Sequence, residues 1–379
     1  MEALRVLTIV FLACISISQA VTPPSTNPQV QGLFVFGDSA LDGGENTYIP
    51  GSKIVSAVPP YGKTYFSKPT GRWTDGRTIA DFLAQALGLP LLPPFLEPGA
   101  NFLSGVNFAS AGAGLLDETN AHHGVISMNQ QLRQFRNVTN EYRKEKGVEF
   151  TNHLLKNSVA LFSMGANDIA NALPSPYLFQ QMIQAYSSAI QEIYSYGIKH
   201  IIILLVPPIG CTPNLRALSA QSRNTNLTPE GCTGIINILV DAYNTQLQNL
   251  AIKLHHDFRE LNIATLNPSP VIMNVLRNPQ KYGFKEAEKA CCGGGPFNAA
   301  EFCGDADKHD WKPDHKNKYA KFVCDNPKDY LYFDSNHFTE AGYWFVMKNF
   351  WYGSYNIARP SSLNFFFAGF NVPNPPPRP

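Results

Sequence analysis

The chain has 379 residues, with 30 lysine and arginine residues against 29 aspartate and glutamate residues. No long run of either charge occurs, which argues against a protein that binds nucleic acid or an anionic membrane surface through a basic patch. The length fits one large domain or two medium ones.

The N-terminus predicts a secretory signal peptide over residues 1–20. A single arginine precedes an apolar run over residues 6–17, and the small residues Ser18 and Ala20 suit a cleavage site. A membrane anchor is the alternative, but the run is shorter than the roughly 20 apolar residues of a spanning helix. We therefore expect a protein that is secreted to the extracellular space or the apoplast, or delivered to the vacuole.

Short apolar runs alternate with helical patterns along the chain. Strands are predicted over residues 33–36, 159–163, 201–206 and 263–266, and helices over residues 78–87, 177–196, 235–261 and 271–278. Such alternation is typical of parallel strands joined by crossover helices, and continuous apolar strands are expected where helices cover both faces of the sheet. We predict an α/β protein, a three-layer α/β/α sandwich with a mostly parallel central sheet.

This fold is predicted as a single domain over residues 21–370, because no linker marks a boundary. Proline-rich stretches such as "VPPYG" indicate rigid loops, and residues 371–379 indicate a disordered proline-rich tail.

Six cysteines remain after removal of the signal peptide, and an even number in a secreted chain predicts disulfides. The sequence does not say which cysteines pair, although a bridge between the neighbours Cys291 and Cys292 would be strained. A metal site is the alternative, but no Cys-x-x-Cys or Cys/His spacing supports it. Asn-x-Ser/Thr sites at Asn137 and Asn226 predict glycosylation on surface loops. The six cysteines are Cys211, Cys232, Cys291, Cys292, Cys303 and Cys324.

Ser39 directly follows the first predicted strand, in "FVFGDSALD". An open parallel sheet has its ligand site beyond the carboxyl ends of the strands, so Ser39 stands where a nucleophile would. A serine hydroxyl needs a base and a group that orients the base. Asp334 and His337, three residues apart in "FDSNHFTEAGY", can supply both, because the carboxylate can accept a hydrogen bond from Nδ1 while Nε2 faces the serine.

Acyl transfer also needs hydrogen-bond donors for the developing oxyanion. The glycines of "GVNFASAGAG" let the backbone come close to a substrate. In "SMGANDI", Asn167 can aim its side-chain N–H₂ at the oxyanion, and Asp168 can hold the local turn.

With these blocks in this order, the chain resembles the plant GDSL esterases/lipases of the SGNH hydrolase superfamily over essentially the whole mature sequence. The resemblance implies a flavodoxin-like SGNH hydrolase fold and ester hydrolysis without a cofactor. It also implies that Ser39 is the nucleophile and an oxyanion donor through its backbone N–H. Gly112 and Asn167 would be the other donors, and His337 the base oriented by Asp334.

Two residues depart from the family pattern. Ala40 replaces the usual leucine after the serine, and we expect it in the same buried position, with altered packing rather than lost activity. Glu45 stands where relatives more often carry asparagine, and we expect it near the cleft, where it tunes substrate choice.

These observations predict a secreted, monomeric serine esterase or lipase that hydrolyses small-molecule or lipid esters through an acyl-enzyme. No nucleic acid, metal, cofactor or stable membrane insertion is expected. An α/β-hydrolase fold is disfavoured because its Gly-x-Ser-x-Gly motif does not occur in the sequence. Two alternatives stay open: an acyltransferase with the same catalytic residues, and a catalytically weak secreted defence or binding protein.

Overall fold

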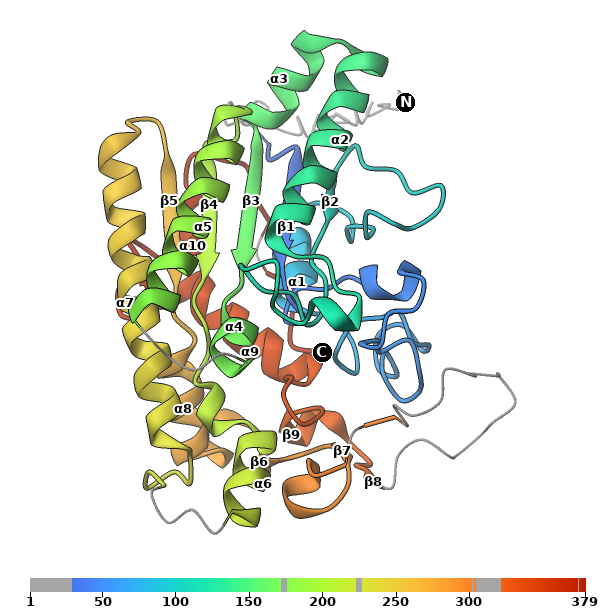
Figure 1. The fold of residues 1–379 in the computed structure, drawn as a ribbon, viewed down its shortest axis with the longest axis vertical. Coiled ribbons are helices and arrows are strands. Elements are labelled where there is room, and N and C mark those ends of the chain that lie inside the picture. Colours follow the sequence, from blue (N-terminus) through green and yellow to red (C-terminus); the bar gives the residue numbers. More distant parts are fainter. Residues whose placement is uncertain (1–28, 172–175, 223–226, 302, 305–321, 374) are drawn as a thin grey trace, which may run out of the picture.

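The structure is a computed structural model that describes residues 29–171, 176–222, 227–301, 303–304, 322–373 and 375–379. The predicted signal peptide and Asn226 lie outside these residues. Within them, the central sheet has six strands in the order β10-β5-β4-β3-β1-β2 (Figure 1). Their bounds are β1 Gly32–Gly37, β2 Gly105–Asn107, β3 Ser158–Ser163, β4 His200–Leu204, β5 Asn262–Leu266 and β10 Ala358–Arg359.

Strands β1 to β5 pair in parallel, and β10 adds an antiparallel edge to β5. The parallel order 2-1-3-4-5 is that of flavodoxin-like sheets, in which the connections turn in opposite directions between β1 and β3. The predicted fold class is therefore confirmed. The order also identifies the carboxyl ends of β1 and β3 as the place where a ligand site is expected.

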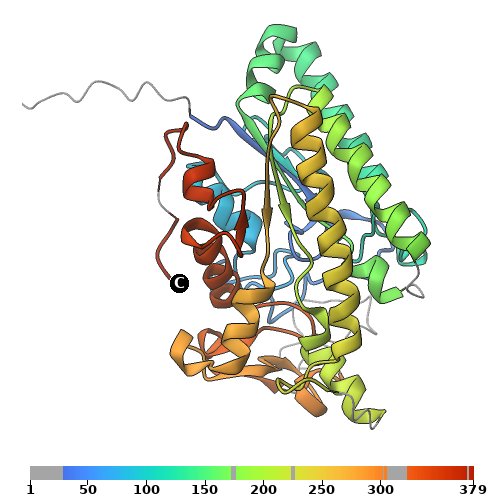
Figure 2. The same ribbon diagram turned by 90° about the vertical axis from the view of Figure 1, so that its left-hand side faces the viewer.

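Helices cover both faces of the sheet (Figure 2). In β1, Leu33 and Val35 join one apolar core while Phe34 and Phe36 join the other, because successive side chains of a strand point to opposite faces. The first face carries α1 Ile79–Ala86, α8 Ser269–Arg277, α9 Glu340–Tyr352 and α10 Leu363–Phe366. The second carries α2 Met128–Lys146, α3 Val148–Lys156, α5 Pro176–Ser195 and α7 Gly234–Asp257.

A second region lies beyond the carboxyl ends of β3 and β4, at the lower end of Figure 1. There β6 Glu286–Ala290 pairs with β9 Tyr330–Tyr332, and β7 Cys292–Gly293 pairs with β8 Phe322–Val323. Disulfides Cys291–Cys324 and Cys292–Cys303 cross-link it. We call the described residues within 286–332 the disulfide lobe.

Shorter elements complete the chain. They are α4 Ala166–Asn171, α6 Pro213–Gln221 and the 3₁₀ helices Glu45–Tyr48, Ala121–His123, Ile209–Cys211, Gln280–Tyr282, Pro296–Asn298 and Pro327–Asp329. Each predicted strand and helix has a counterpart with slightly shifted bounds; the strand predicted over 201–206, for example, ends at Leu204, ahead of two prolines.

The proline-rich tail, expected to be disordered, makes contacts in its described part. Trp344 Nε1 on α9 donates to the carbonyl of Pro376 at 2.9 Å, and Arg378 Nη2 donates to the carbonyl of Gly283 at 3.0 Å. Prolines lack an N–H but keep a carbonyl, so the tail can still accept hydrogen bonds from the domain.

Asn137 does not lie on a loop, contrary to expectation. It sits within α2, where its side chain is exposed while Thr139, two residues on, is fully buried. The Thr139 hydroxyl donates to the carbonyl of Phe135. The apolar stripe that docks α2 on the sheet overrides the surface-loop preference of this tripeptide.

Candidate active site

The end of β1 is held in place by helix α2. Fully buried Gln131 pairs with the peptide of Gly37, whose N–H donates to Oε1 at 2.9 Å and whose carbonyl accepts from Nε2 at 2.8 Å. The chain then turns tightly, and the carbonyl of Asp38 accepts the N–H of Asp42 at 3.0 Å. Ser39 therefore projects from a rigid turn at the carboxyl end of β1.

The structure brings Ser39, His337 and Asp334 together. His337 Nε2 lies 2.7 Å from Ser39 Oγ, although 298 positions separate the two residues. His337 Nδ1 lies 2.8 Å and 2.9 Å from the two carboxylate oxygens of Asp334. An ionised carboxylate can only accept, so Nδ1 carries the proton and Nε2 accepts the serine hydroxyl.

Asp334 is 2% exposed and ionised. Burial by itself raises its pKa, but His337 and the hydrogen bonds from His337, from the N–H of Asn336 and from the hydroxyl of Tyr61 more than offset this. The pKa of Asp334 therefore lies below its usual value of 3.8. The imidazole faces a permanent negative charge.

His337 is fixed by the start of α9. Thr339 caps this helix, since its side chain accepts the N–H of Gly342 at 3.0 Å, and its hydroxyl donates to the carbonyl of Tyr330 at 2.7 Å. Helix α9 thus starts directly after Thr339. The indole ring of Trp73 lies 5.1 Å from the imidazole, measured between ring centroids.

Three possible oxyanion donors line one cavity with the triad. The N–H groups of Ser39 and Gly112 have no hydrogen-bond acceptor among the described residues. Gly112 has φ +81°, and a Cβ there would meet Ile54 Cδ1 at 2.6 Å, so only glycine fits. Asn167 Nδ2 donates one hydrogen to the carbonyl of Ala113 at 2.9 Å. Its second N–H has no acceptor within the part of the chain that the structure describes.

Two buried carboxylates hold the loop that carries Gly112. Asp42 accepts the N–H of Ala111 at 2.9 Å, and Asp168 accepts the N–H of Leu115 at 3.0 Å and the hydroxyl of Thr119 at 2.7 Å. Asp168 was expected to hold its own turn. Its side chain instead points to the loop that follows β2 and holds that loop. Burial raises the pKa of Asp42 to about 6.

The cavity has a volume of about 830 Å³, and much of its lining is apolar. This volume lies in the range of pockets that enclose whole small molecules. An ester with a hydrophobic acyl or alcohol part would find matching surface there. The apolar lining includes Ile54, Val55, Val58, Met164, Val206 and Leu215.

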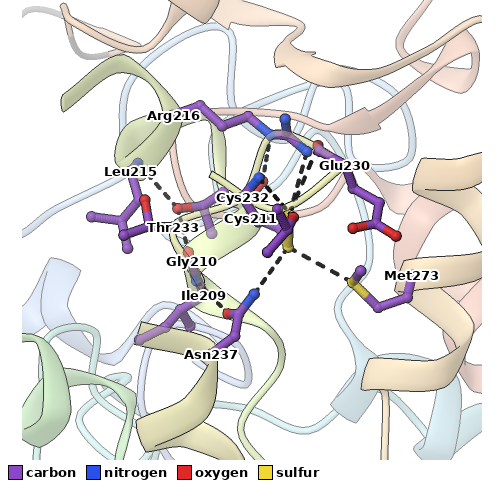
Figure 3. Close-up of a disulfide and its surroundings, with 12 residues drawn as sticks. Ile209, Gly210, Cys211, Leu215, Arg216, Glu230, Cys232, Thr233, Asn237 and Met273 are labelled. Atoms are coloured by element: carbon purple, nitrogen blue, oxygen red, sulfur yellow. Dashed lines mark hydrogen bonds between the residues drawn. A yellow bond between two sulfur atoms is a disulfide. The ribbon is translucent and has the colours of Figure 1, made fainter. Parts of the chain in front are cut away.

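One cavity wall is the loop after β4, which the third disulfide, Cys211–Cys232, ties to the segment before α7 (Figure 3). Asn237 accepts the N–H of Gly210 at 2.9 Å, and Arg216 Nε donates to the carbonyl of Cys211 at 3.0 Å. The structure thus pairs all six predicted disulfide cysteines.

The two departures from the family pattern lie elsewhere than expected. Ala40 is half-buried and lines the cavity, while its neighbour Leu41 is fully buried in the core. Glu45 is also fully buried and does not line the cavity. It accepts the N–H of Leu96 at 2.9 Å and a hydrogen from Gln134 Nε2 at 2.9 Å, which makes it part of the support for the loops.

Within the described ranges, no group of three or more histidine, cysteine, aspartate or glutamate side chains could hold a metal ion. His309 and His315 fall outside those ranges. No helix in the same part of the chain combines the length and apolar character that crossing a bilayer requires.

Sequence reasoning missed Tyr61 and Trp73, which both line the cavity beside the triad. Tyr61 lies in "VPPYG", interpreted only as a rigid loop, and Trp73 in "GRWTDGR". The one available signal was the presence of large aromatic residues in loops rich in glycine and proline, where an apolar residue has no helix or strand face to fill.

The described residues thus combine an open parallel sheet, a Ser-His-Asp set at its switch point and nearby N–H groups without acceptors, an arrangement that is typical of hydrolases. The chain belongs to the GDSL-like lipase/acylhydrolase family, whose model matches residues 33–350. It is a GDSL-type carboxylic ester hydrolase.

Two relatives match nearly the whole chain. A GDSL lipase from Tanacetum cinerariifolium is 35% identical over 373 residues, which cover 97% of this chain and 95% of that protein. GDSL esterase/lipase 5 from Arabidopsis thaliana is 35% identical over 376 residues, covering 95% and 93%. Among solved structures, a member of the lipolytic G-D-S-L family from Veillonella parvula aligns with TM-score 0.29 and 13% identity over 70% of this chain and 87% of that one.

Proposed function

We propose that this protein is a secreted serine esterase or lipase that cleaves carboxylic esters through a covalent acyl-enzyme. The observation that carries the proposal is the 2.7 Å contact between His337 Nε2 and Ser39 Oγ, with ionised Asp334 behind the imidazole. This arrangement is what activates a serine hydroxyl.

In the first half of the reaction, Ser39 Oγ attacks the ester carbonyl while His337 Nε2 takes its proton. The negative charge on the former carbonyl oxygen is stabilised by the N–H groups of Ser39 and Gly112 and by Asn167 Nδ2. His337 then gives its proton to the leaving alcohol. Asp334 stays ionised and stabilises the imidazolium.

In the second half, His337 removes a proton from water, and the hydroxide attacks the acyl-enzyme. The same donors hold the second oxyanion, the acid leaves, and Ser39 regains its proton from His337. The apolar cavity walls suit a hydrophobic group on the substrate.

A hydrolysis screen with p-nitrophenyl esters of graded acyl length tests the proposal, with wild type compared to Ser39→Ala. We expect wild-type hydrolysis and fluorophosphonate labelling, and loss of both in Ser39→Ala with an unchanged circular dichroism spectrum. Hydrolysis that persists in Ser39→Ala would refute the assignment of the nucleophile.

Secretion and glycosylation belong to the same proposal. Expression in a eukaryotic cell with the full sequence should release the protein into the medium, with an N-terminus at residue 21. A glycosidase-sensitive mass difference that Asn137→Gln or Asn226→Gln removes would identify the modified asparagine. Retention of an uncleaved chain inside the cell would contradict secretion.

A further inference from the structure

The carboxylate of Asp334 has a partner from a remote part of the chain. Its Oδ1 accepts the N–H groups of Asn336 at 2.9 Å and His337 at 2.8 Å, both from its own loop. Its Oδ2 accepts the hydroxyl of Tyr61 at 2.8 Å, across 273 positions of sequence. Among the described residues, Tyr61 supplies the one side-chain hydroxyl bonded to this carboxylate.

Tyr61 has little freedom to move away. It is 3% exposed, and its ring packs edge-on against Trp73 at 5.7 Å and Phe333 at 5.3 Å between centroids. Its N–H donates to the carbonyl of Val58 at 3.1 Å. The ring also belongs to the buried cluster formed by the two disulfides of the lobe. The hydroxyl is therefore held against Asp334 by rigid surroundings.

The same aromatic contacts continue to the base. Trp73, which packs on Tyr61, lies 5.1 Å from the imidazole of His337. Tyr61 is thus linked to Asp334 directly, by a hydrogen bond. It is linked to His337 indirectly, through the ring of Trp73.

The hydroxyl also matches the charge that Asp334 must keep. A buried carboxylate is costly unless hydrogen bonds stabilise its ionised form. Burial, together with the negative charge of Asp334, raises the pKa of Tyr61 well above its usual range, so the phenol remains a donor.

We propose that Tyr61 is a positioning residue of the active site: its hydroxyl fixes the orientation of the Asp334 carboxylate, and thereby the imidazole of His337 against Ser39. The Tyr61 hydroxyl donates to Asp334 rather than to Ser39 or His337, so it acts through Asp334. The inference rests on the proposed function for its kinetic consequence, but not for the hydrogen bond itself.

The test is Tyr61→Phe, which keeps the ring and removes only the hydroxyl. The matched control is Tyr65→Phe, because Tyr65 is 44% exposed, lies in the same loop region and does not line the cavity. Since a hydrogen bond to a buried charge is lost, we expect kcat to fall about 10- to 100-fold. We expect KM to stay within about twofold, because the proton of this hydroxyl is already donated to Asp334. Tyr65→Phe should match wild type.

A double-mutant cycle separates this role from a general loss of structure. In the Asp334→Ala background, which lacks both acceptor oxygens, Tyr61→Phe should lower kcat no further. Proton NMR gives a readout that needs no turnover. The low-field resonance of the proton between His337 Nδ1 and Asp334 should shift in Tyr61→Phe and not in Tyr65→Phe.

An unchanged kcat together with an unchanged low-field resonance in Tyr61→Phe would overturn the inference. An equal loss of kcat in the Asp334→Ala background would also overturn it, because the hydroxyl would then act elsewhere. A wild-type protein that hydrolyses no ester would refute the proposed function instead, and the resonance would still decide the role of Tyr61.

Discussion

The two halves of the active site are held by different kinds of structure. Ser39 and Asn167 stand at the carboxyl ends of β1 and β3, neighbouring central strands whose side chains are fully buried on both faces. Asp334 follows β9 of the disulfide lobe, whose apolar cluster is small and consists largely of cysteines and the rings of Tyr61 and Phe333.

The geometry of the site therefore depends on two sources of rigidity, one in the sheet and one in the disulfide lobe. Apolar burial on both faces stabilises the strand ends, whereas a small lobe has too little apolar surface to do so. In the lobe, disulfides and hydrogen bonds take over: the N–H of Cys292 donates to the carbonyl of Phe333 at 2.7 Å, directly before Asp334. Perturbations of the lobe should therefore affect the acid and base before they affect the nucleophile.

The largest effect on kcat is expected when Asp334, which follows the disulfide lobe, loses its charge. Asp334→Asn should lower kcat about 10³- to 10⁴-fold, because an amide favours the wrong tautomer of His337. Circular dichroism should match wild type, since the substitution keeps the shape of the side chain. Steady-state hydrolysis of a p-nitrophenyl ester measures the loss, and a decrease of less than tenfold would contradict the assigned role.

Asn167→Ala tests the sheet side of the site separately, because it removes a group at the carboxyl end of β3 and leaves the disulfide lobe unchanged. Removing one oxyanion donor should lower kcat about 10²- to 10³-fold. Fluorophosphonate labelling of Ser39 serves as a check that the nucleophile is still present. The control is Asn152→Ala, an exposed asparagine on α3, which should leave kcat unchanged. Equal kcat values for the two variants would remove Asn167 from the oxyanion hole.

Removal of the Cys292–Cys303 disulfide tests whether the disulfide lobe positions Asp334. The double variant Cys292→Ser with Cys303→Ser should lose about 2–4 kcal/mol of the free energy of unfolding, as typical for a disulfide that closes a short loop. Thermal unfolding would report the loss, and kcat should fall because the lobe no longer holds Asp334. A variant with lowered stability but wild-type kcat would show that the lobe does not position Asp334.

The smallest effect on kcat is expected at Glu45, on the sheet side. Burial raises the pKa of Glu45 from its usual 4.5 to about 8, so the folded protein holds a proton that the unfolded chain releases. This contribution to stability is complete below about pH 4.5 and is lost as the pH rises through about 8, a change of about 5 kcal/mol at most.

Glu45→Gln should remove this pH dependence. The wild-type Tm should therefore fall relative to the Tm of the variant between pH 5 and pH 8.5, while kcat stays the same. Parallel Tm profiles for the two proteins across this range would show that the Glu45 carboxyl does not titrate in this window.

Local patterns could predict the parts of this site that stand at the ends of regular elements. Ser39 follows an apolar run, and Thr339 marks the helix start just after His337, so their places could be deduced from periodicity and capping. Tyr61 could not, because its loop has no periodicity and its partner is 273 positions away. The choice among disulfide pairings is likewise a property of the folded chain. Burial of Glu45 was missed because its acidic side chain suggests exposure.

The long sequence separation between Ser39 and His337 has a consequence during synthesis. The nucleophile leaves the ribosome early, while the base is among the last parts of the domain to be made. In the proposed mechanism, the serine until then lacks the group that takes its proton, so the nascent chain should not cleave esters. Under this proposal, activity should begin only when the domain is complete, and a product truncated ahead of residue 337 should be inactive.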